Sequence, residues 1–265
     1  YGVISTTFVI FTQVFTDFGV PKVIGGNYNV LATDIYKEVV GMQNFQMGAV
    51  ISLVLLLPAI LAFFVDQYSR KRQVALLSSR SVVFDPKKYR TLDMAMLAFC
   101  GLITVIILMM IGMAQLGALV KFWPYNLSLT LKHYSFDVAG LGWESFYNSI
   151  RLAFYTAVFG TVIIFVGSYI VEKLRTQEQL RGILQFFALL PMAVPGLVLG
   201  LSYIFYFNAA NNPLNFIYAT MAIMVINTVV HFYTVSHLTA VTALKQMDKE
   251  FEAVSLSLKV PVFKM

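Results

Sequence analysis

The sequence predicts an all-α fold, a polytopic bundle of transmembrane helices, and three observations support this. Hydrophobic residues make up 58% of the 265 residues and charged residues only 12%, which is about half the charged share of a soluble domain. The mean hydropathy is +0.75. Long apolar runs recur without the period-2 alternation of a membrane β-barrel. A soluble chain needs more polar surface than this to cover its core, so the apolar surplus belongs against lipid.

Six apolar runs are long enough to cross a membrane as helices, since a span needs about 20 mostly apolar residues. Their polar residues are mostly Ser, Thr, Asn and Gln, which can satisfy one another or the backbone within a bundle. Acidic residues stay at or near the span ends, and no charged residue lies at the middle of a span, which disfavours a proton-coupled carrier. The predicted spans are residues 3–20, 45–65, 94–116, 150–170, 183–206 and 214–233.

The distribution of Lys and Arg predicts the orientation, because basic residues collect in cytoplasmic loops. They are concentrated after the second, fourth and sixth spans, and the opposite loops carry fewer. The net charge of +6 therefore follows membrane topology, and we expect no nucleic-acid partner. The predicted cytoplasmic set is Arg70, Lys71, Arg72, Arg80, Lys87, Lys88, Arg90, Lys173, Arg175, Arg181, Lys245, Lys249, Lys259 and Lys264; the opposite set is Lys22, Lys37, Lys121, Lys132 and Arg151.

The sequence motifs exclude several kinds of chemistry. There is no GxxxxGK[ST] phosphate-binding loop, so the chain is not itself expected to bind and hydrolyse ATP. The three histidines, His133, His231 and His237, show no ligand-like grouping with Cys or acidic residues. Because metal ligands come in clusters, we interpret these histidines as packing residues. We expect no catalytic residue, no metal site and no cofactor.

The fifth predicted span contains a proline- and glycine-rich stretch at residues 190–200. Pro191 and Pro195 lack backbone N–H donors and are predicted to kink or break the helix. Gly196 and Gly200 form a GxxxG pair, which allows another helix to approach closely. Two compatible interpretations stay open: a kinked packing helix, or a helix that lines a translocation path and flexes during gating.

The segment at residues 238–265 is predicted to be cytoplasmic, amphipathic and helical. Acidic residues open a second short helical stretch, and Pro261 ends it. This pattern fits either a helix lying at the membrane interface or a helix that docks into a groove on a cytoplasmic partner. The apolar residues at helical spacing are Leu238, Val241, Leu244 and Met247.

This tail resembles the EAA loop of binding-protein-dependent ABC transporter permeases. Glu252 and Ala253 match the start of the motif, Val254 stands at its second alanine, and Leu258 replaces the family's glycine. The resemblance implies a coupling helix that inserts into an ATP-binding subunit. The docking candidates are Asp248, Glu250, Glu252, Ala253, Val254, Ser255, Leu258 and Lys259.

Other segments resemble the same family. Residues 129–135 and 148–150 resemble the entry into a permease core, and residues 190–200 resemble its proline-glycine span. Residues 15–22 and 30–36 resemble the late external segment of a preceding unit. The chain thus resembles a slice of a fused two-unit permease with the MetI-like fold. The implied domains are 1–66, the last two spans of a first unit; 67–93, a basic cytoplasmic linker; and 94–265, a second unit truncated after its coupling loop.

The stretches 122–134, 191–205 and 242–261 are most similar to 2-aminoethylphosphonate permeases, a branch that also has the Ser-Leu-Lys-Val-Pro of residues 257–261. The resemblance implies a non-enzymatic, ATP-driven importer in a bacterial inner membrane for 2-aminoethylphosphonate, ferric iron or another small solute. Its partners would be cytoplasmic ATP-binding subunits, a periplasmic solute-binding protein and membrane lipid. An ATP-independent carrier or channel and a membrane scaffold are the alternatives.

Overall fold

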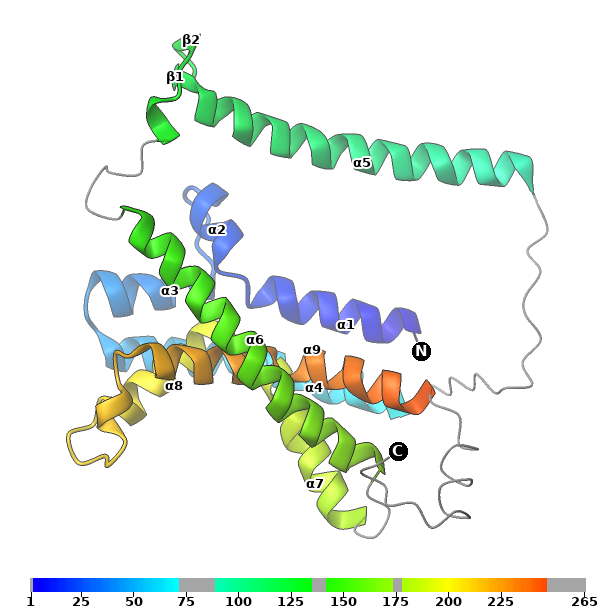
Figure 1. Ribbon diagram of the computed structural model, residues 1–265, viewed down its shortest axis with the longest axis vertical. Helices are drawn as coiled ribbons and strands as arrows, with labels where there is room; N and C mark the ends of the chain where they lie inside the picture. The colour runs from blue at the N-terminus through cyan, green and yellow to red at the C-terminus, as the bar shows by residue number, and fades with distance from the viewer. Residues whose placement is uncertain (1, 72–88, 135–141, 174–177, 247–265) are drawn as a thin grey trace. The chain divides into compact units, whose positions relative to one another are not determined.

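The computed structural model describes residues 2–71, 89–134, 142–173 and 178–246 (Figure 1). Within these ranges the backbone is helical apart from turns and one small hairpin. Two compact units emerge, one formed by residues 1–79 and 152–265 and the other by residues 80–151.

Four helices in the described ranges are long and apolar enough to cross a membrane, and a bent pair of helices makes a fifth crossing if the pair is counted as one span. The prediction of an all-α, polytopic transmembrane bundle is therefore confirmed. The long helices are α4 (Phe45–Lys71), α5 (Arg90–Leu119), α6 (Gly142–Lys173) and α9 (Met221–Gln246); the bent pair is α7 (Glu178–Leu189) and α8 (Gly196–Phe207).

The first predicted span, at residues 3–20, extends too far. Helix α1 (Gly2–Phe15) has 14 residues, or about 21 Å at 1.5 Å per residue. The side chain of Asp17 accepts a hydrogen bond from the backbone N–H of Gly19 at 3.0 Å, and the short helix α2 (Gly19–Ile24) starts there. An Asp after an apolar run favours such a turn, which a count of apolar residues overlooks.

The last predicted span, at residues 214–233, is shifted along the chain. Helix α9 starts later and extends further, and residues 215–217 form a 3₁₀ turn instead. The side chain of Asn212 donates to the carbonyl of Tyr206 at 2.7 Å, and that of Asn215 donates to the carbonyl of Phe207 at 2.8 Å. These bonds satisfy carbonyls at the end of α8, and they keep the connection to α9 in turns.

Helix α4 runs antiparallel to the bent pair α7–α8. Phe45, at the start of α4, meets Phe205 near the end of α8, with ring centroids 6.3 Å apart. Phe63, late in α4, packs with Leu189 at the end of α7. The order of contacts is therefore reversed along the two elements.

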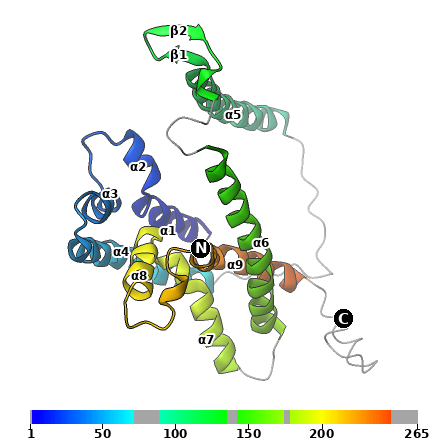
Figure 2. The ribbon, with the colours of Figure 1, turned by 60° about the vertical axis from the view of Figure 1, so that its left-hand side comes forward.

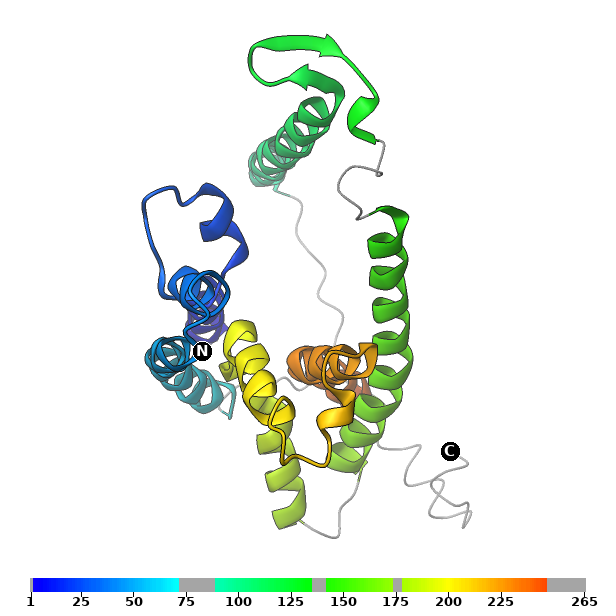
Figure 3. The same ribbon diagram turned by 90° about the vertical axis from the view of Figure 1, so that its left-hand side faces the viewer.

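Helices α6 and α9 run in the same direction and cross each other obliquely (Figure 1), and Figure 3 looks nearly along α9 with α6 beside it. Gly160 lies against Val229, and eight residues further on the hydroxyl of Ser168 lies 2.9 Å from Nδ1 of His237. Because the two helices end on the same side, the segment between them must carry the chain back across the bundle. We therefore interpret the bent pair as one broken span and not as a re-entrant loop.

Three buried clusters hold this unit together. One joins α3 (Leu31–Tyr36), α4 and α8, another joins α4, α7 and the 3₁₀ turn η4 (Leu190–Ala193), and the last joins α6 and α9. The turn η4 therefore takes part in the packing, with Ala193 buried and its other three residues half-buried. The cluster residues are Ile35, Leu55 and Val198; Phe63, Leu189 and Ala193; and Ile164, Val225 and Val229.

The second unit holds α5 and a small antiparallel hairpin, β1 (Val120–Phe122) and β2 (Asn126–Leu129), followed by the 3₁₀ turn η2 (Lys132–Tyr134) (Figure 2). Helix α5 has no buried residue among those described, and it is apolar on all sides, as expected of a helix that meets lipid or other spans. The hairpin was not predicted from the sequence. The backbone N–H of Thr130 donates to the carbonyl of Leu119 at 2.7 Å and ties the hairpin to the end of α5.

Candidate functional site

The candidate site is the break between α7 and α8, in the stretch that the sequence singled out. Helix α7 ends at Leu189, η4 follows, and α8 begins at Gly196 with Pro195 as its N-cap. The two helices are bent by 107°. The predicted break is confirmed, and its cause is the missing N–H of Pro191 together with the fixed φ of Pro195, which suits the start of a new helix.

A side chain from α9 satisfies the backbone at the break. The hydroxyl of Thr234 donates to the carbonyl of Ala188 at 2.8 Å, and Thr234 is only 1% exposed. Carbonyls in the last turn of an α-helix lack a partner within the helix, and inside a membrane such groups must find one in the protein. A neighbouring Thr is one of the groups that makes a broken span tolerable.

The two glycines of the GxxxG pair differ in their surroundings. A Cβ at Gly196 would lie 3.2 Å from Cε1 of His231 on α9, whereas a Cβ at Gly200 would meet nothing within 4 Å. The predicted close approach of a helix is therefore found at Gly196 and not at Gly200. The pattern identified the close-packed stretch, but only contact with a neighbour distinguishes one glycine from the other.

Polar atoms without hydrogen-bond partners accompany this contact. Within the described residues, Oδ1 of Asn227, Nδ1 of His231 and Oγ1 of Thr156 are buried and unpaired. Asn227 precedes His231 by four residues, so both lie on the face of α9 that meets α8. Polar atoms of this kind cost free energy in an apolar environment, which makes the α8–α9 contact the polar part of the site.

The contact between α6 and α9 is also polar and close. Besides the Ser168–His237 contact, the ring of Tyr233 stacks on that of His237 with centroids 5.8 Å apart. Gly167 leaves the space that the Tyr233 hydroxyl occupies, since a Cβ there would overlap the hydroxyl oxygen. This contact holds α9 firmly against α6, and it confirms that His237 packs within the bundle.

An apolar groove of about 580 Å³ lies on another side of the same helix pair. Tyr155, Phe159 and Ile163 of α6 line it, with a longer row of apolar side chains from α9 that ends at Tyr233. Its lining carries no charged group, so a charged or strongly polar solute would find few partners there. The break between α7 and α8 is therefore a better candidate than this groove for a path that a polar solute could follow.

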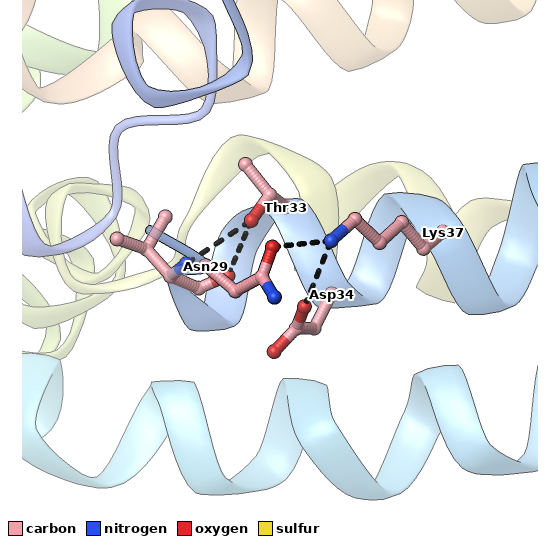
Figure 4. A network of polar contacts seen from close by, with 5 residues as sticks. Asn29, Thr33, Asp34 and Lys37 are labelled. Carbon is pink, nitrogen blue, oxygen red and sulfur yellow. Dashed lines mark hydrogen bonds and ion pairs between the residues drawn. The ribbon is translucent and has the colours of Figure 1, made fainter. Parts of the chain in front are cut away.

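The segment that the charge pattern places outside is held by local bonds (Figure 4). Thr33, in α3, accepts the backbone N–H of Val30 at 3.1 Å and donates to its carbonyl at 2.7 Å. Lys37 donates to Asn29 and lies 3.8 Å from a carboxylate oxygen of Asp34. These contacts give residues 29–37 a defined shape at one end of the unit.

An aromatic contact joins α2 to the same segment. The ammonium group of Lys22 lies 4.6 Å from the centre of the Tyr36 ring, and Phe18 packs against that ring with centroids 5.0 Å apart. The segment that is predicted to be external thus contains short packed helices.

The predicted docking residues of the tail, at positions 248–259, lie outside the described residues. Helix α9 leads directly to them and ends at Gln246. Near this end, Nζ of Lys245 lies 3.9 Å from a carboxylate oxygen of Glu172 on α6.

Thr234 is not among the residues predicted from the sequence. Its signal was present but weak: Asn227, His231 and Thr234 recur at helical spacing, but α9 also carries other polar residues, among them Thr228, Ser236 and His237. Such a polar face predicts contact with another helix. It does not predict which backbone carbonyl the hydroxyl will reach, because that depends on how two distant segments pack.

These features together define a polytopic α-helical membrane protein with a broken span inside its packed interior. The chain is 33% identical over 263 residues to the ferric transport system permease protein FbpB 1 of Haemophilus influenzae, covering 95% of this chain and 40% of that protein. It is 31% identical over 262 residues to the ferric transport system permease protein FbpB of Actinobacillus pleuropneumoniae, covering 95% and 37%. The chain thus spans about two fifths of the length of these curated relatives. No protein-family model and no solved structure matches it.

Proposed function

We propose that the chain is part of the transmembrane permease of an ATP-driven importer in a bacterial inner membrane. The observation that carries this proposal is the identity of 31% and 33% with two ferric transport permeases along 95% of the chain. The break in the fifth span supports it, because discontinuous helices often form solute paths in transporters. The protein would perform no covalent chemistry.

Two partners belong to the proposal. Cytoplasmic ATP-binding subunits would clamp the tail, with Asp248, Glu250, Glu252, Ala253, Val254, Ser255, Leu258 and Lys259 as the docking residues. A periplasmic solute-binding protein would deliver the solute to the external segments, which include the surface around Tyr36 and Lys37. The support is the resemblance of the tail to an EAA loop and the basic loops beside it.

The proposed domain organisation assigns residues 1–66 to a first permease unit, residues 67–93 to a linker and residues 94–265 to a second unit. In this scheme α4 belongs to the first unit and the bent pair to the second. Their packing, through Leu55 and Val198, would be a contact between the two permease units. Pro191, Pro195, Gly196 and Gly200 would line or gate the path.

Ferric iron and 2-aminoethylphosphonate are the two solutes to compare first. The two similar permeases are ferric transport proteins, which favours ferric iron, whereas the tail sequence at residues 257–261 favours the phosphonate. The test is uptake into proteoliposomes that contain the full-length permease, its ATP-binding subunits and its binding protein. We expect one of the two solutes to be taken up, and we expect this uptake to require ATP on the side of the membrane that holds the ATP-binding subunits. Uptake that persists without ATP would support the carrier or channel alternative instead.

Docking of the tail has its own test. A cysteine in place of Glu252, in a chain in which Cys100 is replaced by alanine, should crosslink to the ATP-binding subunit. A cysteine in place of Tyr28, on the external segment and 87% exposed, is the matched control and should not. Equal crosslinking at both positions, or none at Glu252, would contradict the docking proposal.

A further inference from the structure

Thr234 differs from the other threonines of its helix. The hydroxyls of Thr228, Thr239 and Thr242 each bond a carbonyl four residues earlier in α9 itself. The hydroxyl of Thr234 instead crosses to the carbonyl of Ala188, in the last turn of α7. Among the threonines of α9, this one alone reaches the broken span.

The position of this bond matters because α9 contacts both sides of the break. Thr234 holds the end of α7, and His231, less than one helical turn earlier, lies against Gly196 at the start of α8. Leu238, one turn later, packs on the cluster that contains Ala193 of η4. Side chains from two turns of α9 therefore contact the end of α7, the cluster around η4 and the start of α8.

The hydrogen bond from Thr234 matters because the Ala188 carbonyl has few other possible partners. A carbonyl at a helix end inside the membrane has no water to bond. If the Thr234 hydroxyl is removed, the Ala188 carbonyl must regain a partner by a change of backbone conformation around Pro191. The conformation of the break is thus coupled to a single side chain on a neighbouring helix.

We infer that Thr234 is a positioning residue that fixes the angle between α7 and α8. Through it, a movement of α9 changes the bend of the broken span. The inference deepens the proposed function, in which the bend forms part of the solute path. Helix α9 leads from this contact to the proposed docking tail, so the same helix would connect ATP-driven movement of the tail to the path.

The experiment measures the bend directly. Spin labels are attached to cysteines that replace Ile183 on α7 and Tyr206 on α8, two exposed positions, in a chain with Cys100→Ala. The distance between the labels is measured by pulsed electron paramagnetic resonance, in the full-length permease assembled with its ATP-binding subunits in nanodiscs. Thr234→Val removes the hydroxyl with little change of shape, and Thr234→Ser keeps it.

We expect Thr234→Val to shift or broaden the distance distribution and Thr234→Ser to reproduce that of the parent. Thr239→Val is the matched control, because its hydroxyl bonds its own helix on an exposed face, and it should leave the distribution unchanged. An unchanged distribution in Thr234→Val would overturn the inference. Thr234→Ala is measured as a second variant that lacks the hydroxyl. Because alanine favours the helix, it can be used if the valine variant folds poorly.

Transport provides an independent measurement. In proteoliposomes, Thr234→Val should lower the maximal uptake rate about tenfold, with little change in the concentration of loaded binding protein that gives half-maximal uptake. Thr234→Ser should restore the rate. If the parent shows no ATP-dependent uptake, the proposed function fails, whereas the distance measurement still decides the role of Thr234.

Discussion

The hydroxyl of Ser168 lies 2.9 Å from Nδ1 of His237 and 2.8 Å from the carbonyl oxygen of Ile164. Both side chains are buried, at 0% and 1% exposure, and the contact joins α6 to α9. A hydroxyl has one hydrogen to donate. The Ser168 hydroxyl donates this hydrogen to the carbonyl of Ile164 in its own helix. In the bond between the helices it must then accept a hydrogen from Nδ1 of His237, an assignment that follows from the hydrogen-bond network.

Replacement of Ser168 by alanine should weaken this contact between helices. We expect a loss of about 1 kcal/mol in the free energy of unfolding, the usual size of a hydrogen bond between membrane helices. Unfolding in mixed micelles with increasing sodium dodecyl sulfate measures it. Ser202→Ala is the control, because the hydroxyl of Ser202 bonds a carbonyl of its own helix. Equal losses in the two variants would show that the contact with His237 contributes nothing.

Gly167→Ala should destabilise the same helix pair for a steric reason. The added methyl group would overlap the hydroxyl of Tyr233, and overpacking of this kind costs about 1–3 kcal/mol. Tyr233→Phe removes that hydroxyl and should restore most of the loss in the double variant. Gly112→Ala, in open space on α5, is the control and should change little. The free energies of unfolding of the four variants form the test, and a lack of rescue by Tyr233→Phe would contradict it.

The two glycines of α8 should respond differently to alanine. Gly196→Ala brings a methyl group within 3.2 Å of the His231 ring, whereas Gly200→Ala meets nothing within 4 Å. We expect Gly196→Ala to lower both the free energy of unfolding and the uptake rate, and Gly200→Ala to leave stability unchanged or slightly raised. His231→Ala in the Gly196→Ala background should relieve the steric part. A stronger effect at Gly200 would show that a contact outside this chain uses that glycine.

Thr33→Val should loosen the start of α3 without unfolding the bundle. Its hydroxyl makes both bonds to the backbone of Val30, and the loss of a helix-start bond costs about 0.5–2 kcal/mol. The measurement is hydrogen–deuterium exchange of the peptide that contains the Val30 amide, which should become faster. The control is Thr7→Val, where an exposed hydroxyl bonds its own helix. Unchanged exchange at Val30 would contradict the role of Thr33.

Composition and hydropathy predicted most of the architecture, because a helix that crosses the lipid bilayer needs a long run of mostly apolar residues. The predicted spans 45–65, 94–116 and 150–170 lie inside α4, α5 and α6. The break was also predictable, because Pro191 and Pro195 act through their own covalent structure. In both cases the cause lies within the segment itself.

The remaining features depend on partners far along the chain. Asn212 and Asn215 end α8 through bonds to its carbonyls, which shifts the start of α9. The pairing of Thr234 with Ala188 joins residues 46 positions apart. Local sequence reveals that such polar side chains exist, whereas packing decides what they bond.

The common direction of α6 and α9 has a consequence for compartments. When two helices end on the same side of the bilayer, the chain between their two ends crosses the bilayer an even number of times. The bent pair and α9 supply those two. A reporter enzyme fused after Lys173 and another fused after Gln246 should therefore report the same compartment, and one inserted at Ala210 should report the opposite one. Despite its 107° bend, the α7–α8 pair thus counts as one crossing when the side of each loop is assigned.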